Sequence, residues 1–181
     1  VVDPRRTELA KNADLWLQLR PGTDDALALA MLHTIIEEKL YDAAFVSEWT
    51  HGFEALAERV KRYSPEWAAP ITWVPAEKIR AAARLYAATK PSMMEWGCAI
   101  EHTPNTIQTV RAISMLPALT GNVDVPGGWV FGMKGLGRFP SLIENLTPEM
   151  NAKRLGADRF KMLSGEGADL PAAYIPTRLS A

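Results

Sequence analysis

Three short stretches of the sequence combine residue types that suit nucleotide binding. The first is Asp3-Pro4-Arg5-Arg6-Thr7. Its acid can accept hydrogen bonds from ribose hydroxyls or a base edge, and its arginines can bind phosphates through two parallel bonds. A turn whose aspartate caps a short helix accounts for the same residues equally well.

The second stretch is Arg20-Pro21-Gly22-Thr23-Asp24. Glycine lets a ligand approach the backbone, and free N–H groups at a helix start can contact its polar atoms. The Asp24 carboxylate can accept both N–H donors of a guanine edge. A capped helix start is the alternative, and it accounts for Thr23 and Asp25 but not for Arg20.

The third stretch runs from Gly97 to Thr103 and contains Glu101 and His102. His102 can donate to a phosphate or a pterin ring, and Glu101 can contact a ligand. The alternatives are a locally bonded histidine at a helix start and a solvated glutamate. Cys98 is predicted to be a small buried apolar residue.

The elements that must position these stretches follow from hydrophobic spacing. Leu15–Leu19 is a compact apolar run that ends at a Pro-Gly turn, which predicts a strand. Leu27, Met31 and Ile35 then recur at helical spacing. Residues 15–38 are therefore predicted to form a strand, a turn and a helix, with Thr23 as the N-cap.

Further elements are predicted along the chain. Short helices are expected over 5–13, 43–49 and 54–63, and a longer one over 76–89. Strands are expected at 1–2 and 92–97, with an irregular connection over 67–75. Another helix should begin at Thr103-Pro104, kink or end at Pro117, and stop by Asn122.

Strands that alternate with helices predict an α/β fold, with a parallel, doubly wound, Rossmann-like sheet and flanking helices. Ligands of such sheets lie at the carboxyl ends of the strands, which selects loops 3–7, 20–24 and 97–103. The domain is expected over 1–131. Residues 132–181 are expected to be an irregular extension that leads to a missing domain.

Composition excludes several function classes. The chain has 181 residues and a formal net charge of −1, so no basic field attracts nucleic acid or anionic lipid. Its single cysteine allows no disulfide, cysteine-based zinc site or iron–sulfur cluster. No apolar run is long enough to enter a membrane. The abrupt start at Val1-Val2 suggests an excised piece, so the compartment is unknown.

Catalytic signals are also missing. The three histidines lack metal-ligand spacing, and no Ser/His/Asp or paired-carboxylate arrangement is visible. The nicotinamide fingerprint G-x-G-x-x-G is absent as well. We therefore predict no catalytic residues and no metal ligands in this chain, which alone should be inactive.

Two blocks resemble a known family. Val-Val-Asp-Pro-Arg-Arg-Thr is followed by Ala-Asp-Leu-Trp-Leu-Gln-Leu-Arg-Pro-Gly-Thr-Asp-Asp-Ala-Leu. Together with Gly97–Thr103 and Leu119–Gly128, they resemble the molybdopterin oxidoreductases of the dimethylsulfoxide reductase type. The resemblance covers about residues 1–131. The stretch Glu101–Thr106 is nearer to the acetylene hydratase-like subgroup than to formate dehydrogenases or nitrate reductases.

The resemblance implies which residues hold a molybdopterin guanine dinucleotide. Asp3, Pro4, Arg5 and Thr7 would line its ribose and phosphate side. Gly22, Thr23 and Asp24 would hold the guanine, with Arg20 preceding them. Gly97, Glu101 and His102 would approach the phosphates or the pterin. Family members often have glutamine and histidine there, so this chain departs from the pattern at Glu101.

The resemblance further implies a larger parent enzyme that performs a redox or hydration reaction at molybdenum or tungsten. A 4Fe-4S cluster and the metal ligand would lie upstream. The partners would be the remaining domains and electron-transfer subunits. Two alternatives stay open: a domain for another nucleotide, such as a nicotinamide cofactor, and a non-enzymatic interaction module whose aromatic residues form its surface.

Overall fold

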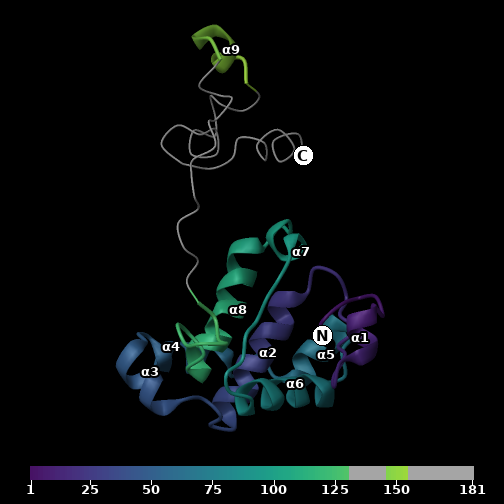
Figure 1. Ribbon diagram of the computed structural model, residues 1–181, viewed down its shortest axis with the longest axis vertical. Coiled ribbons are helices and arrows are strands. Elements are labelled where there is room, and N and C mark those ends of the chain that lie inside the picture. The colour runs from purple at the N-terminus through teal and green to yellow at the C-terminus, as the bar shows by residue number, and fades with distance from the viewer. Residues whose placement is uncertain (131–145, 155–181) are drawn as a thin grey trace. The chain divides into compact units, whose positions relative to one another are not determined.

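Helix α2, Asp24–Glu37, is the central element of the fold in the computed structural model, which describes residues 1–130 and 146–154. It packs against α5 (Pro65–Thr72), α6 (Ala76–Ala88) and α8 (Thr106–Thr120) (Figure 1). Side chains at helical spacing fill this contact, because Leu32 and Ile35 are fully buried.

Smaller helices complete the unit Val1–Gly132. They are α1 (Glu8–Asn12), α3 (Ala43–Trp49), α4 (Phe53–Val60) and α7 (Cys98–Glu101). The second unit, Met133–Ala181, contains α9 (Pro148–Ala152), whose first turn is capped by the Thr147 hydroxyl. The helices predicted over 43–49 and 76–89 are thus confirmed, to within one residue.

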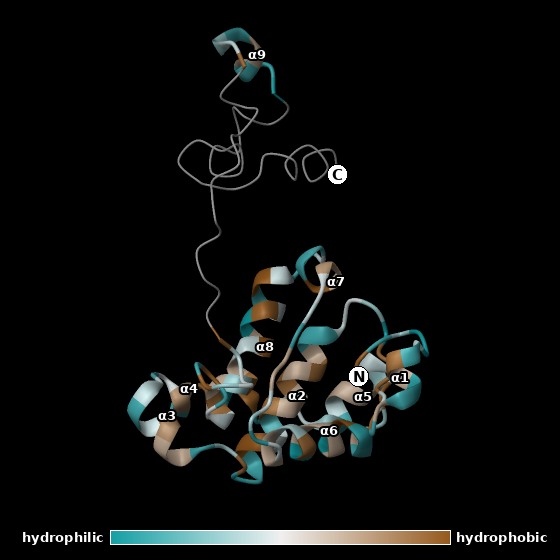
Figure 2. Ribbon diagram, in the orientation of Figure 1, coloured by the Kyte–Doolittle hydropathy of each residue, from teal (hydrophilic) through white to brown (hydrophobic). Residues whose placement is uncertain are grey.

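Helix α6 shows why the prediction from spacing succeeds. Ile79, Ala83 and Ala87 recur every four residues and are buried. Figure 2 shows hydrophilic and hydrophobic residues alternating along α6, whereas the middle of α2 is mostly white to brown. A surface helix buries one stripe only, and a central helix buries more of its circumference.

The predicted parallel, doubly wound sheet is wrong. The described residues contain two isolated bridges and no sheet, and one bridge joins Val2 and Leu17 in parallel. In that bridge the Asp3 N–H donates to the Leu17 carbonyl at 3.2 Å and the Leu17 N–H to the Val1 carbonyl at 2.9 Å. The segment 92–97 is extended without strand pairing, and the Ser92 N–H donates to the Asn122 side chain. A β-strand is stabilised by backbone hydrogen bonds to a neighbouring strand. Residues 1–2, 15–19 and 92–97 make almost no such bonds.

Two local predictions also fail. Residues 65–72 form α5 where an irregular connection was expected, because Ser64 caps a helix that begins at Pro65. Helix α8 begins at Thr106 after the N-cap Asn105, not at Thr103-Pro104. The helix continues past the fully buried Pro117 and stops at the C-cap Gly121, whose φ of 67° suits glycine, so the predicted stop by Asn122 is confirmed.

Asp42 connects the start of α3 with Lys90 and with the end of α8. Its carboxylate accepts the Phe45 N–H at 3.0 Å, which caps α3, and the Lys90 ammonium at 2.9 Å. Its own N–H donates to the Leu119 carbonyl at 2.8 Å. The capping N–H, and then Lys90, hold the pKa of Asp42 below its usual value of 3.8.

We expect Asp42→Ala to lower the free energy of unfolding by about 0.5–2 kcal/mol at neutral pH, as loss of an N-cap does. Because the folded pKa is lowered, this stabilisation is present above pH 3.8 and is lost as the pH falls through the folded pKa. Urea unfolding at pH 7 and in acid measures both. Glu48→Ala, an exposed change in α3, is the control, and equal losses in the two variants would contradict the role of Asp42.

Candidate functional site

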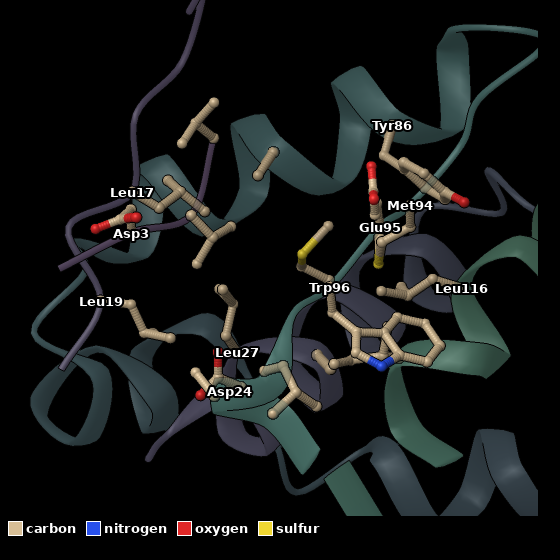
Figure 3. Close-up of a pocket in the computed structure, with 18 of the residues that line it drawn as sticks. Asp3, Leu17, Leu19, Asp24, Leu27, Tyr86, Met94, Glu95, Trp96 and Leu116 are labelled. Atoms are coloured by element: carbon tan, nitrogen blue, oxygen red, sulfur yellow. The ribbon is translucent and has the colours of Figure 1, made fainter. Parts of the chain in front are cut away.

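A pocket of about 850 Å³ opens beside the N-terminal half of α2. Its walls come from residues 1–4, 14–22, α2, α6, the connection 92–103 and α8. Figure 3 shows Asp3 and Asp24 on one side, with Tyr86, Glu95 and Trp96 on the other. Segments far apart in the sequence therefore meet at one concave surface, which is the usual form of a small-molecule site.

The predicted site residues divide into two sets. Five line the pocket: Asp3, Pro4, Gly22, Asp24 and Gly97. The other six do not line it: Arg5, Thr7, Arg20, Thr23, Glu101 and His102. The pocket thus brings together one residue or more from each of the three predicted loops, although the sheet that was expected to align them is absent.

The first loop is held by hydrogen bonds to the 15–19 segment. The Trp16 indole N–H donates to the Asp3 carbonyl at 2.9 Å, and the Gln18 amide donates to the Pro4 carbonyl at 3.1 Å. One Asp3 carboxylate oxygen accepts the Arg5 N–H at 2.7 Å. The Thr7 hydroxyl accepts the Ala10 N–H and caps α1. Local capping therefore occupies Thr7 and one of the two Asp3 oxygens.

The second loop turns sharply at Gly22, where φ is 79° and a side chain would be strained. Thr23 occupies the N-cap position of α2, but its hydroxyl donates to the Arg20 carbonyl at 2.7 Å and caps no helical N–H. This bond closes the turn. It places Asp24, the first residue of α2, at the pocket wall.

The neighbouring aspartates Asp24 and Asp25 have different surroundings. The Asp25 carboxylate accepts the Ala26 N–H at 2.8 Å and the Asn105 side chain at 2.6 Å. The half-buried Asp24 carboxylate has no ion pair or side-chain partner in the described residues. Burial, and to a smaller extent the charge of Asp25, raise the pKa of Asp24 above 3.8. Asp24 is therefore a desolvated acceptor that a ligand could satisfy.

The third loop contributes its backbone and apolar side chains. Gly97, Ala99, Ile100 and Thr103 line the pocket. The short helix α7 buries Ile100 and exposes Glu101 and His102. Cys98 is exposed, so the prediction that it is buried is wrong. Successive side chains of a helix point in different directions, so Ile100 is buried while Glu101 is exposed. This helical turn was not predicted.

Sequence reasoning missed the far wall of the pocket. Tyr86, Met94 and Trp96 line it, and the Trp96 ring packs edge-on against Trp129 with centroids 5.4 Å apart. The Tyr86 hydroxyl is buried without a hydrogen-bond partner in the described part of the chain. Burial raises the pKa of Tyr86 to about 12. The nearby Thr120 hydroxyl, which donates to the Leu116 carbonyl at 2.9 Å, opposes that shift to a smaller extent.

The described lining of the pocket is rich in hydrogen-bond acceptors. Its described lining includes the acids Asp3, Asp14, Asp24 and Glu95 and includes no lysine, arginine or histidine. Such a wall suits N–H and O–H donors and opposes phosphate. Within residues 1–130 and 146–154, no cluster of three metal-binding side chains is found. Nor does any helix there have the length and apolar character to cross a membrane.

Comparison with known proteins gives the family. Residues 1–175 match the family described as molybdopterin oxidoreductase. The chain is 38% identical over 171 residues to acetylene hydratase of Syntrophotalea acetylenica, covering 92% of this chain and 23% of that protein. It is 43% identical over 135 residues to formate dehydrogenase H of Escherichia coli K12, covering 75% of this chain and 19% of that protein.

A solved structure agrees with these sequence matches. Acetylene hydratase from Pelobacter acetylenicus superposes with a TM-score of 0.72 and 39% identity, over 90% of this chain and 23% of that chain. The chain thus spans about a quarter or less of the length of these relatives. The match to the family covers nearly the whole chain, and the sequence resemblance to this family is confirmed. The chain belongs to the molybdopterin oxidoreductase family.

Proposed function

We propose that this chain holds the guanosine end of a molybdopterin guanine dinucleotide within a larger molybdenum or tungsten enzyme. The observation that supports this most is the Asp24 carboxylate, which is half-buried in the pocket wall without an ion pair or side-chain partner among the described residues. A guanine edge presents two adjacent N–H donors to such a carboxylate. Adenine has an acceptor at the corresponding ring nitrogen and cannot make both bonds.

The pocket lining suits the guanosine end of this cofactor better than its diphosphate. Asp3 and Asp24 are acceptors suited to ribose hydroxyls and guanine N–H groups. The Tyr86 hydroxyl is a further unused polar group. A diphosphate does not fit beside these acids, so Arg5, Thr7 and His102, which do not line the pocket, would hold it outside.

The remaining assignments belong to the same proposal. Residues 1–131 form the cofactor-binding domain, with Gly22 and Thr23 shaping the guanine site and Pro4 the ribose side. Gly97, Glu101 and His102 lie toward the phosphates or the pterin. When bound, the cofactor's metal supplies the redox or Lewis-acid chemistry. The remaining domains would carry the metal ligand and a 4Fe-4S cluster, and electron-transfer subunits would be partners.

Asp24→Asn in the full-length enzyme should weaken cofactor retention, while Asp25→Asn should change it much less. Losing one partner of a charged pair costs on the order of 2–4 kcal/mol when donors are left unpaired. Molybdenum or tungsten and guanine nucleotide are measured per folded polypeptide in both variants. Full occupancy in a folded Asp24→Asn enzyme would mean that this residue only begins a helix.

Acidification should weaken the binding of GMP and, through Asp24, stabilise the ligand-free protein. Only the ionised Asp24 accepts two N–H bonds, so affinity for GMP should fall as the pH falls through the raised pKa, above 3.8. In the ligand-free protein the same acidification protonates a desolvated carboxylate and removes its unfavourable contribution to stability. Titration with GMP and thermal unfolding from pH 4 to 7 are compared between wild type and Asp24→Asn, because their difference separates the two trends of Asp24 from those of other carboxylates such as Asp42. Parallel trends would contradict the assignment.

The chain assayed by itself should be catalytically inactive, because its sequence supplies no metal ligand and no complete acid–base or nucleophile set. The purified chain is tested with added molybdate, cofactor and redox dyes. Heat-denatured chain sets the background rate. Substantial turnover above that background would show that a catalytic group has been overlooked.

A further inference from the structure

Trp73 has an unusual combination of backbone and side-chain properties. It follows the last residue of α5 with φ 63° and ψ 9°, a left-handed conformation that glycine adopts most easily. Its N–H donates to the Ala69 carbonyl at 2.9 Å, which holds it there. The side chain is nevertheless 68% exposed. A large aromatic residue thus occupies a strained position without filling the core, and such strain concentrates at functional sites.

The loop that carries Asp24 is tied to Trp73. The Arg20 N–H donates to the Thr72 carbonyl at 2.9 Å, and the Arg20 guanidinium carbon lies 5.4 Å from the centroid of the Trp73 ring. Thr72 is fully buried and accepts the Val74 N–H on its hydroxyl at 3.2 Å. Backbone and side chain together therefore hold the ring beside Arg20.

The turn that contains Arg20 connects this ring to the candidate guanine site. Four peptide units separate Arg20 from Asp24, so their Cα atoms are at most about 15 Å apart. The bond from the Thr23 hydroxyl to the Arg20 carbonyl folds the turn and shortens that distance. Neither Arg20 nor Trp73 lines the pocket. Arg20 belongs to the turn that presents Asp24, and Trp73 follows α5 and contacts Arg20.

Most other tryptophans have an aromatic or hydrogen-bonding partner within the fold. Trp16 donates to the Asp3 carbonyl, Trp67 packs against Tyr63, and Trp96 packs against Trp129. Trp49 is as exposed as Trp73, at 71%, but it ends α3 and has no bond to the 20–24 loop. Trp49, Trp67 and Trp73 are all exposed, and among these described residues only Trp73 contacts the 20–24 loop.

We infer that Trp73 and Arg20 form a stacking platform for the purine base of the bound nucleotide. This inference rests on the function proposed above. A planar base stacks on an aromatic ring or a guanidinium plane through its face, whereas Asp24 contacts its edge. Because every base has such a face, the platform contributes affinity and leaves the choice of guanine over adenine to Asp24.

The test is the rate at which the full-length holoenzyme releases guanine nucleotide in urea below its unfolding midpoint. Trp73→Gly removes the ring and relieves the positive φ, so the protein should fold at least as stably as wild type. Release should become about 5- to 100-fold faster, which corresponds to the loss of one stacking contact. Trp73→Phe should lie between Trp73→Gly and wild type, and the control Trp49→Ala should match wild type.

The outcomes separate this inference from the proposed function. Faster release from Trp73→Gly with an unchanged guanine preference supports the platform. Wild-type release from a folded Trp73→Gly enzyme overturns it, and the proposed function survives if Asp24→Asn still loses cofactor. Wild-type release from both variants, or a holoenzyme without guanine, overturns both. Equal acceleration in Trp49→Ala would show a general effect of exposed tryptophans and overturn the platform.

Discussion

Burial of helix α2 is the constraint on which the rest of the structure depends. Ala30, Leu32 and Ile35 have no exposed surface, and α5, α6 and α8 all pack against this helix. Removing a side chain of this kind from a packed core typically costs several kcal/mol. The position of the first turn of α2 is therefore set by the core, and that turn carries Asp24 to the pocket.

Some of this architecture could be predicted because helices are local. The spacing of Leu27, Met31 and Ile35 predicts α2 without knowledge of its neighbours, since helical hydrogen bonds close within one segment. The run Leu15–Leu19 was equally apolar, but a sheet depends on backbones elsewhere, and only the Val2–Leu17 bridge forms. Pro117 does not end α8, because it removes a single N–H donor and the packing of α8 against α2 offsets that loss.

The candidate site was predictable where it depends on loop chemistry and not where it depends on packing. Asp3, Gly22 and Gly97 were selected as residues at the ends of predicted strands, and they line one pocket although the sheet is absent. Tyr86 and Trp73 carried no such signal. The buried hydroxyl of Tyr86 becomes evident only when α6 and α8 are placed together. The conformation of Trp73 follows from where α5 ends.

The hydrogen bond from Asn105 to Asp25 has a consequence for transplanting this site. At 2.6 Å, it connects the residue before α8 with the first turn of α2, across 80 positions of the sequence. Grafting residues 20–24 into another member of the family would transfer the turn and the first residue of α2 without this brace. A working graft would need Asn105 as well, so the smallest transferable module is discontinuous in the chain.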